Sequence, residues 1–120
     1  MDPLSLGEWG QALFATWWGA HLLTFRVFGK YDDLYTGLSA LAPQWAWGVL
    51  FVAIGTGIIA ASVSASLVWR RVAMTAHSAT MITMWTSFMR VDVAMTSTPT
   101  YGSWTVLALG LLLLLVLRRE

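Results

Sequence analysis

The sequence predicts an all-α membrane protein with three transmembrane helices, preceded by an amphipathic helix that lies in the membrane interface. Apolar residues make up 58% of the 120-residue chain and charged residues only 11%, against about 45–50% and about 25% in soluble domains. A chain this short has too much surface for its volume to hide so many apolar side chains from water. We therefore expect lipid or partner subunits to cover the apolar surface that the chain itself cannot bury.

The first predicted transmembrane helix covers residues 45–69, which contain no ionisable side chain. A helix of this length extends about 37 Å, enough to cross an apolar layer of about 30 Å. Aromatic residues are enriched where a helix enters and leaves a bilayer, and basic residues follow on the cytoplasmic side. The expected interfacial anchors of this helix are Trp45, Trp47, Trp69, Arg70 and Arg71.

The second predicted span, residues 72–89, combines a sufficient length with many polar groups. It has no acidic residue, Lys or Arg, but it carries His77 and six hydroxyl side chains. Ser and Thr hydroxyls can bond to the carbonyl four residues earlier or to a neighbouring helix, which offsets their cost in lipid. Because the hydroxyls spread around the helix, other helices should surround it. We predict that it is the inner helix of the bundle.

The third predicted span, residues 101–117, is short and rich in leucine. It follows a polar connection that contains Asp92 and Pro99. With three spans, both arginine pairs of the chain fall on one side, which the positive-inside rule makes cytoplasmic. The C-terminus is therefore predicted to be cytoplasmic. The expected interfacial anchors of this span are Tyr101, Trp104, Arg118 and Arg119.

Residues 4–28 are predicted to form the amphipathic helix. Ser5 and Glu8 have the spacing of a capping box, and Gln11 and Arg26 share a face with Glu8. The opposite face carries Trp17 and other aromatic residues. A helix with this pattern is typical of the plane of the membrane interface. A fourth transmembrane helix is the alternative, and residues 32–42 are expected to form a short helix or loop.

Small residues follow one side of the first span and predict close helix packing. Gly57, Ala61 and Ala65 recur every four residues, and Ser62 and Ser66 form a second line. Small residues at this spacing let two helix backbones approach closely, which drives helix association in lipid. The lines predict packing within the chain or self-association. The expected partners are the lipid bilayer and copies of this chain or other membrane subunits.

His77 is the ionisable side chain inside the predicted spans. Intramembrane ionisable groups often mark a path for ions or substrates, whereas a neutral histidine can equally serve as a structural hydrogen-bonding group. We therefore treat His77, with Thr80 one turn further on, as a possible polar intramembrane site.

Several function classes find no support in the sequence. It has no cysteine, no acidic residue at metal-ligand spacing from a histidine, no Gly-rich phosphate loop and no nucleophile elbow. A net charge of +1 gives no electrostatic footprint for nucleic acid. We therefore expect a protein that is not an enzyme, with no catalytic residue, no metal or other cofactor, no nucleic-acid partner and no small-molecule substrate.

The chain combines a small size, closely spaced hydrophobic helices, a small-residue line, the terminal "RRE" and the segment "LAPQWAWGVLFVAIG". In these features it resembles the small membrane proteins of tailed bacteriophages, in particular the holin-like proteins. The resemblance implies self-assembly and permeabilisation of the host cell membrane, which places the chain in the bacterial cytoplasmic (inner) membrane. The alternative is a structural or accessory membrane subunit that scaffolds a partner. A small exporter is less favoured, because proton coupling needs an acid inside a span.

Overall fold

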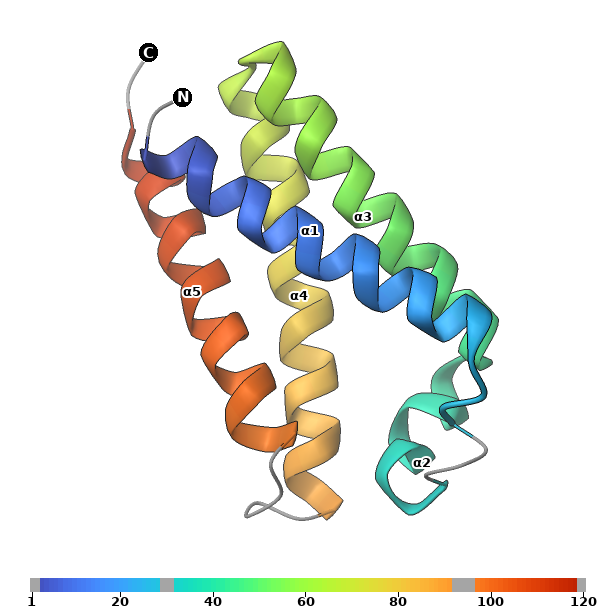
Figure 1. The fold of residues 1–120 in the computed structure, drawn as a ribbon. Helices are drawn as coiled ribbons and strands as arrows, with labels where there is room; N and C mark the ends of the chain where they lie inside the picture. Colours follow the sequence, from blue (N-terminus) through green and yellow to red (C-terminus); the bar gives the residue numbers. More distant parts are fainter. Residues whose placement is uncertain (1–2, 29–31, 92–96, 119–120) are drawn as a thin grey trace.

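The computed structural model describes residues 3–28, 32–91 and 97–118, and it contains five α-helices in these residues (Figure 1). The same residues contain no strand, so the predicted all-α class is confirmed. Side-chain environments are described for residues 4–28, 35, 37–87 and 102–118. The helices are α1 (Pro3–Thr24), α2 (Asp32–Leu41), α3 (Gln44–Ser64), α4 (Leu67–Val91) and α5 (Ser97–Leu117).

The four long helices form two antiparallel pairs, α1 with α3 and α4 with α5 (Figure 1). The short helix α2 packs against α4. The beginning of α1, the turn between α3 and α4, and the end of α5 lie at one end of the bundle (Figure 1). We call this the Arg70 end, after the residue whose contacts are described below, and the opposite one the α2 end.

Three glycines bring the backbones of α1 and α3 into direct contact. A Cβ atom on Gly19 would lie 2.7 Å from the carbonyl oxygen of Gly48, and one on Gly55 would lie 2.9 Å from that of Ala12. Real Cβ atoms do not approach other heavy atoms so closely, so these positions admit no side chain. The close contact of α1 with α3 therefore uses small residues that lie outside the predicted line.

The helix α3 ends at Ser64, before the predicted limit at Trp69. Ala65 adopts the left-handed conformation with φ 57°, which costs a non-glycine residue about 1–2 kcal/mol. The hydroxyl of Ser66 then accepts a hydrogen bond from the backbone N–H of Trp69 at 3.4 Å, as an N-cap of α4 does. Because of this turn, residues 69–71 belong to the first turns of α4 and not to the end of the first predicted span. Ala65 and Ser66 lie in the turn, so they do not continue the predicted packing lines along α3.

Gln44 fixes the connection between α1 and α3. Its Oε1 atom accepts hydrogen bonds from the backbone N–H groups of Val27 at 3.0 Å and Phe28 at 2.7 Å, and its Nε2 atom donates to the carbonyls of Leu22 and Phe25. A helix terminus leaves backbone groups without intrahelical partners, and here one side chain binds a carbonyl in the last turn of α1 and three backbone groups of the connection that follows. The helix ends four residues before the predicted limit at residue 28.

Glu8 and Gln11 of α1 point inward, which corrects the predicted orientation of this helix. Glu8 and Gln11 are each 1% exposed, whereas Trp17 is 62% exposed. Helical periodicity separates a polar from an apolar face, but it does not say which face meets the rest of the protein. In α1, the face that carries Glu8 and Gln11 meets the rest of the protein. The helix also runs along α3 instead of lying apart from the other helices.

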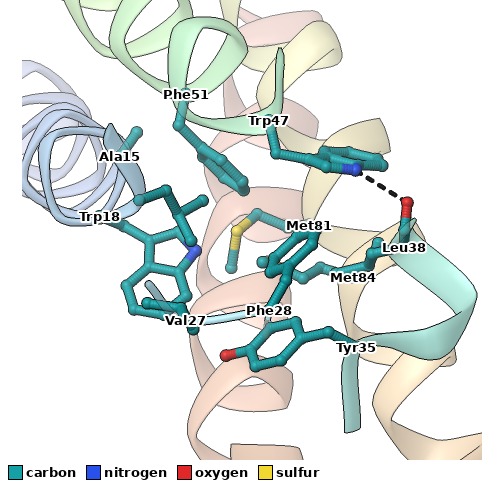
Figure 2. Close-up of a cluster of buried hydrophobic side chains, with 11 residues drawn as sticks. Ala15, Trp18, Val27, Phe28, Tyr35, Leu38, Trp47, Phe51, Met81 and Met84 are labelled. Atoms are coloured by element: carbon teal, nitrogen blue, oxygen red, sulfur yellow. Dashed lines mark hydrogen bonds between the residues drawn. The ribbon is translucent and has the colours of Figure 1, made fainter. Parts of the chain in front are cut away.

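The apolar core near the α2 end is built from α4 methionines and surrounding aromatic rings (Figure 2). Met81 and Met84 pack in one cluster with Trp18, Phe51 and Trp47. The indole N–H of Trp47 donates to the carbonyl of Leu38 at 3.0 Å. Trp47 is therefore a buried core residue in this chain, not the exposed interfacial anchor that was predicted.

Among the described residues, α3 is the one helix that is both long and apolar enough to cross a membrane, with a mean hydropathy of 2.0 over an 18-residue window. The apolar part of α5, Gly102–Leu117, is shorter.

Candidate functional site

A buried ion pair joins α1 to α4 at the Arg70 end of the bundle. The Nε atom of Arg70 lies 3.0 Å and 3.1 Å from the two carboxylate oxygens of Glu8, and its Nη2 atom also contacts Oε1. Arg70 is 7% exposed. Ser5 accepts a further hydrogen bond from Nη2 at 3.4 Å. Both charges are thus removed from solvent and hydrogen-bonded to each other.

A second polar contact lies further along the same two helices. The Nε2 atom of His77 lies 2.7 Å from Oε1 of Gln11, and Nε2 of Gln11 donates to the backbone carbonyl of Trp104 on α5 at 3.3 Å. His77 is completely buried. Gln11 therefore connects α1, α4 and α5 through one side chain.

Helical spacing explains why these groups meet. Ser5, Glu8 and Gln11 follow one another at intervals of three residues, and Arg70 and His77 are seven residues apart, so each set lies on one side of its helix. Because α1 and α4 run in the same direction, the order of the residues along the two helices matches. We call this contact between Ser5, Glu8 and Gln11 on α1 and Arg70 and His77 on α4 the polar seam.

Two adjacent arginines hold two different helices. Arg70 binds α1, whereas Arg71 turns towards α5 and donates to the backbone carbonyls of Leu115 at 2.9 Å and Arg118 at 2.7 Å. A third donation reaches Val116. Carbonyls at a helix C-terminus lack intrahelical partners, and a cation there also interacts favourably with the helix dipole. Both arginines were predicted as interfacial anchors, but each forms a specific contact inside the chain.

The hydroxyls of α4 are satisfied mainly by their own helix. Thr75, Thr80 and Thr83 each donate to the carbonyl four residues earlier, at 2.7–2.9 Å, as predicted for hydroxyls in an apolar environment. Thr80 therefore does not bond to His77. His77 and Thr80, which were predicted to form one polar site, thus bind different partners: His77 contacts Gln11, and Thr80 donates to the carbonyl of Ala76.

An outward-facing groove between α3 and α4 contains part of the predicted packing line. It has a volume of about 450 Å³ and is lined by small residues such as Gly57, Ala61 and Ala76, with Trp69 at one side. No heavy atom lies within 4 Å of a Cβ placed on Gly57. The groove is open at Gly57, whereas Ala61 is 6% exposed and Ser62 is half-buried.

The other predicted anchors have different environments. Trp45 and Trp69 are largely exposed. Trp104 is half-buried and stacks on Phe14 with ring centroids 4.7 Å apart. Arg118 is exposed. Arg119 lies outside the described residues, as does the side chain of Tyr101.

Comparisons of the chain with protein-family models, curated proteins and solved structures find no match. The interpretation of the polar seam consequently depends on its own geometry. The described residues contain no group of three His, Asp or Glu side chains that could hold a metal ion. The carboxylate of Glu8 pairs with the guanidinium of Arg70, and the imidazole of His77 contacts the side chain of Gln11. The arrangement supplies directional contacts between helices and a row of polar groups in the interior.

The role of Glu8 was not predicted from the sequence. This residue was assigned to a capping box near the membrane interface, because Ser5 precedes it by three residues. The observation that could have identified the pair is that Glu8 is the one acidic residue in residues 3–25, which contain no Lys or Arg. An acid buried in such a segment usually pairs with a basic residue of another helix.

Proposed function

We propose that the chain is an integral membrane protein in which α1, α3, α4 and α5 all cross the bilayer. The observation that supports this most is that paired polar side chains lie in the interior while many large apolar side chains are exposed. The interior holds Glu8, Arg70, Gln11 and His77, whereas large apolar residues are more than half exposed on every long helix. In water, so much exposed apolar surface would be unfavourable. Examples of the exposed residues are Leu13, Val63, Val72 and Leu113.

Helix length is compatible with this proposal. The four long helices contain 21 to 25 residues, and about 20 residues are sufficient to cross the apolar layer. The first of them, α1, is as long as its neighbour α3 and antiparallel to it. It would thus cross the membrane as a fourth span, in place of the predicted interfacial helix.

The polar seam contributes to the lower mean hydropathy of α1 and α4 relative to α3 and α5. These two helices supply Glu8, Gln11, Arg70 and His77, which reduce mean hydropathy although they face the interior and not the surrounding medium. Polar and ionisable residues of membrane helices typically face the bundle interior and pair with one another. In this proposal, α3 and α5 have mainly packing and lipid-contacting roles.

For its activity, we propose that the protein associates with copies of itself and makes the membrane permeable to hydrophilic solutes. The groove around Gly57 supports association, since small residues permit close approach of another helix. The buried polar seam supports permeabilisation, since polar groups that line a path must come from the interior of such a bundle. The proposed location is the bacterial cytoplasmic membrane, with the C-terminus in the cytoplasm because Arg71 and Arg118 lie at one end.

The number of crossing helices determines where the two termini lie. With four crossing helices, tags placed before Met1 and after Glu120 should both be cytoplasmic, because an even number of spans returns the chain to its starting side. With three spans and an interfacial helix, the two tags would report opposite sides. The measurement is reporter activity of both fusions in bacteria, combined with extraction of the membrane fraction at alkaline pH. Recovery of the protein in the soluble fraction without detergent would refute the membrane proposal itself.

Filling the groove tests self-association. The substitution Gly57→Leu places a large side chain where the single chain has open space, so the fold should persist while a second helix is kept at a distance. Chemical cross-linking in membranes should yield fewer oligomers than for the original protein. The exposed residue Leu107 on α5 provides a control: Leu107→Val should leave cross-linking unchanged. Equal cross-linking of the Gly57→Leu variant would show that the groove is not the association surface.

An accessory membrane subunit that scaffolds another protein is the second candidate function. The observation in its favour is that the hydroxyls of α4 bond to their own helix, so the outer face of this helix has no need of water. Inducible expression distinguishes the candidates. Permeabilisation predicts growth arrest and leakage of cytoplasmic solutes, whereas a scaffold predicts neither.

A further inference from the structure

Two exposed apolar surfaces of the molecule have complementary shapes. The groove between α3 and α4 is concave and is lined by small residues such as Gly57 and Ala60. On α5, three leucines are each more than half exposed and project outward, and we call them the leucine ridge: Leu113, Leu114 and Leu117. Helices pack when the ridge of one enters the groove of another. One chain therefore carries both parts of such a contact.

The groove and the leucine ridge lie on different sides of the bundle, so they do not meet within one chain. Arg71 binds the end of α5, and the ring of Trp85 lies against Gly102. With 3.6 residues per turn, the groove residues Ala73 and Ala76 point to the opposite side of α4. Figure 1 likewise shows α5 and α3 on opposite sides of the bundle. Each surface is thus open to another molecule.

The groove and the leucine ridge also lie at the same height along the bundle. Arg71 on α4 binds the carbonyl of Leu115 on α5, and the contact of Trp85 described above gives the same register. Because the two helices are antiparallel, Val72, which lines the groove, is level with Leu114. Copies inserted in one orientation share their depth in the bilayer. The ridge of one copy therefore meets the groove of its neighbour at the correct height.

Charge at the Arg70 end favours this combination of surfaces over the alternatives. Arg118, which follows the leucine ridge, is exposed, whereas the groove ends at Ser64, the last residue of α3. A helix C-terminus carries partial negative charge and attracts a cation. Two ridges in contact would instead bring two Arg118 side chains together, and like charges repel. Two grooves in contact would leave a void without partner atoms.

We infer that the groove between α3 and α4 binds the leucine ridge of a second copy of the chain. The contact joins two different surfaces, so each bound pair still has one open groove and one open ridge. Head-to-tail contacts of this kind continue into rings or open chains and do not stop at a dimer. This inference rests on the proposed self-association in a membrane, and it identifies the surface that fills the groove.

Single cysteines test the contact, because the chain has no cysteine of its own. The variants Val72→Cys and Leu114→Cys, with tags of different mass, would be co-expressed and oxidised in membranes with copper phenanthroline. The mixture should give disulfide-linked dimers that contain both tags. Each variant alone should give none, because identical positions do not meet in a head-to-tail contact. A chain with both substitutions should give a series of larger oligomers.

Leu107→Cys is the matched control for Leu114→Cys. Leu107 is also more than half exposed, and it lies on the same side of α5, two turns closer to the α2 end. The two positions are consequently about 10 Å apart along the helix axis. Because a disulfide requires about 3.5–4.5 Å between Cβ atoms, the mixture of Val72→Cys with Leu107→Cys should give no dimer.

Dimers from Val72→Cys alone would overturn the inference in favour of a two-fold contact between grooves. Absence of dimers from the mixture with Leu114→Cys would also overturn it. If Gly57→Leu then still lowers chemical cross-linking, self-association stands and another surface fills the groove. If the original protein itself gives no oligomers on chemical cross-linking, the proposed self-association is refuted. If Val72→Cys does not accumulate, Ala73→Cys replaces it, with the same expectations.

Discussion

Replacing Glu8 with leucine is expected to lower the free energy of unfolding by about 3–5 kcal/mol, because it leaves the charge of Arg70 buried without a partner. The same loss is expected for Arg70→Met, which leaves the carboxylate of Glu8 unpaired. The double variant Glu8→Leu, Arg70→Met removes both charges and should recover most of the stability, since an apolar pair can replace a buried ion pair at little cost. Denaturant titration in detergent micelles measures all three.

The exposed Arg26 serves as the control for this series. The variant Arg26→Met also removes a positive charge, but from a surface position, so its stability should remain within about 0.5 kcal/mol of the original. If Glu8→Leu alone is as stable as the original protein, the ion pair is not buried in the folded state. If the double variant loses the sum of the two single losses, the side chains act independently.

The second large effect is expected from Gly55→Ala. The added Cβ would collide with the hydroxyl of Thr16 and the carbonyl oxygen of Ala12, so α1 and α3 must separate. Overpacking of this kind typically costs about 1–3 kcal/mol, which should exceed the gain of up to about 1 kcal/mol from replacing glycine in a helix. The midpoint of thermal unfolding, followed by circular dichroism in detergent, should decrease.

Gly57 is the matched control, two residues further along the same helix. A Cβ there meets no heavy atom within 4 Å, so Gly57→Ala should keep or slightly raise the unfolding midpoint through helix propensity alone. The two substitutions are chemically identical and differ only in what faces them. Equal midpoints for both variants would contradict the close contact of α1 with α3.

Most of the secondary structure could be predicted from the sequence, because it depends on features that are local. Apolar composition and helical spacing predicted the all-α class, and the long apolar stretch after Pro43 predicted α3. The end of α3 could not be located in this way. Residues 65–69 have no proline or glycine to mark a break, and the turn depends on a left-handed alanine and on the hydroxyl of Ser66.

The polar seam was harder to predict, because it depends on contacts across 62 residues for Glu8 with Arg70 and 66 for Gln11 with His77. The sequence separated the polar and apolar faces of residues 4–28, but assigned the polar face to water. That assumption holds for a helix on a water-facing surface and fails when the polar groups find partners inside. For the same reason, His77 could be identified as unusual, whereas its partner Gln11 was placed on the outside.

The separation of Glu8 from Arg70 has a consequence for biosynthesis in the proposed membrane location. Synthesis proceeds from the N-terminus, so α1 reaches the insertion machinery while its counter-ion is still 62 residues from being made. An unpaired charged residue is costly within an inserting helix. A nascent chain that ends before Arg70 should therefore hold α1 at the membrane surface, and insertion of α1 should become stable only after α4 has emerged from the ribosome.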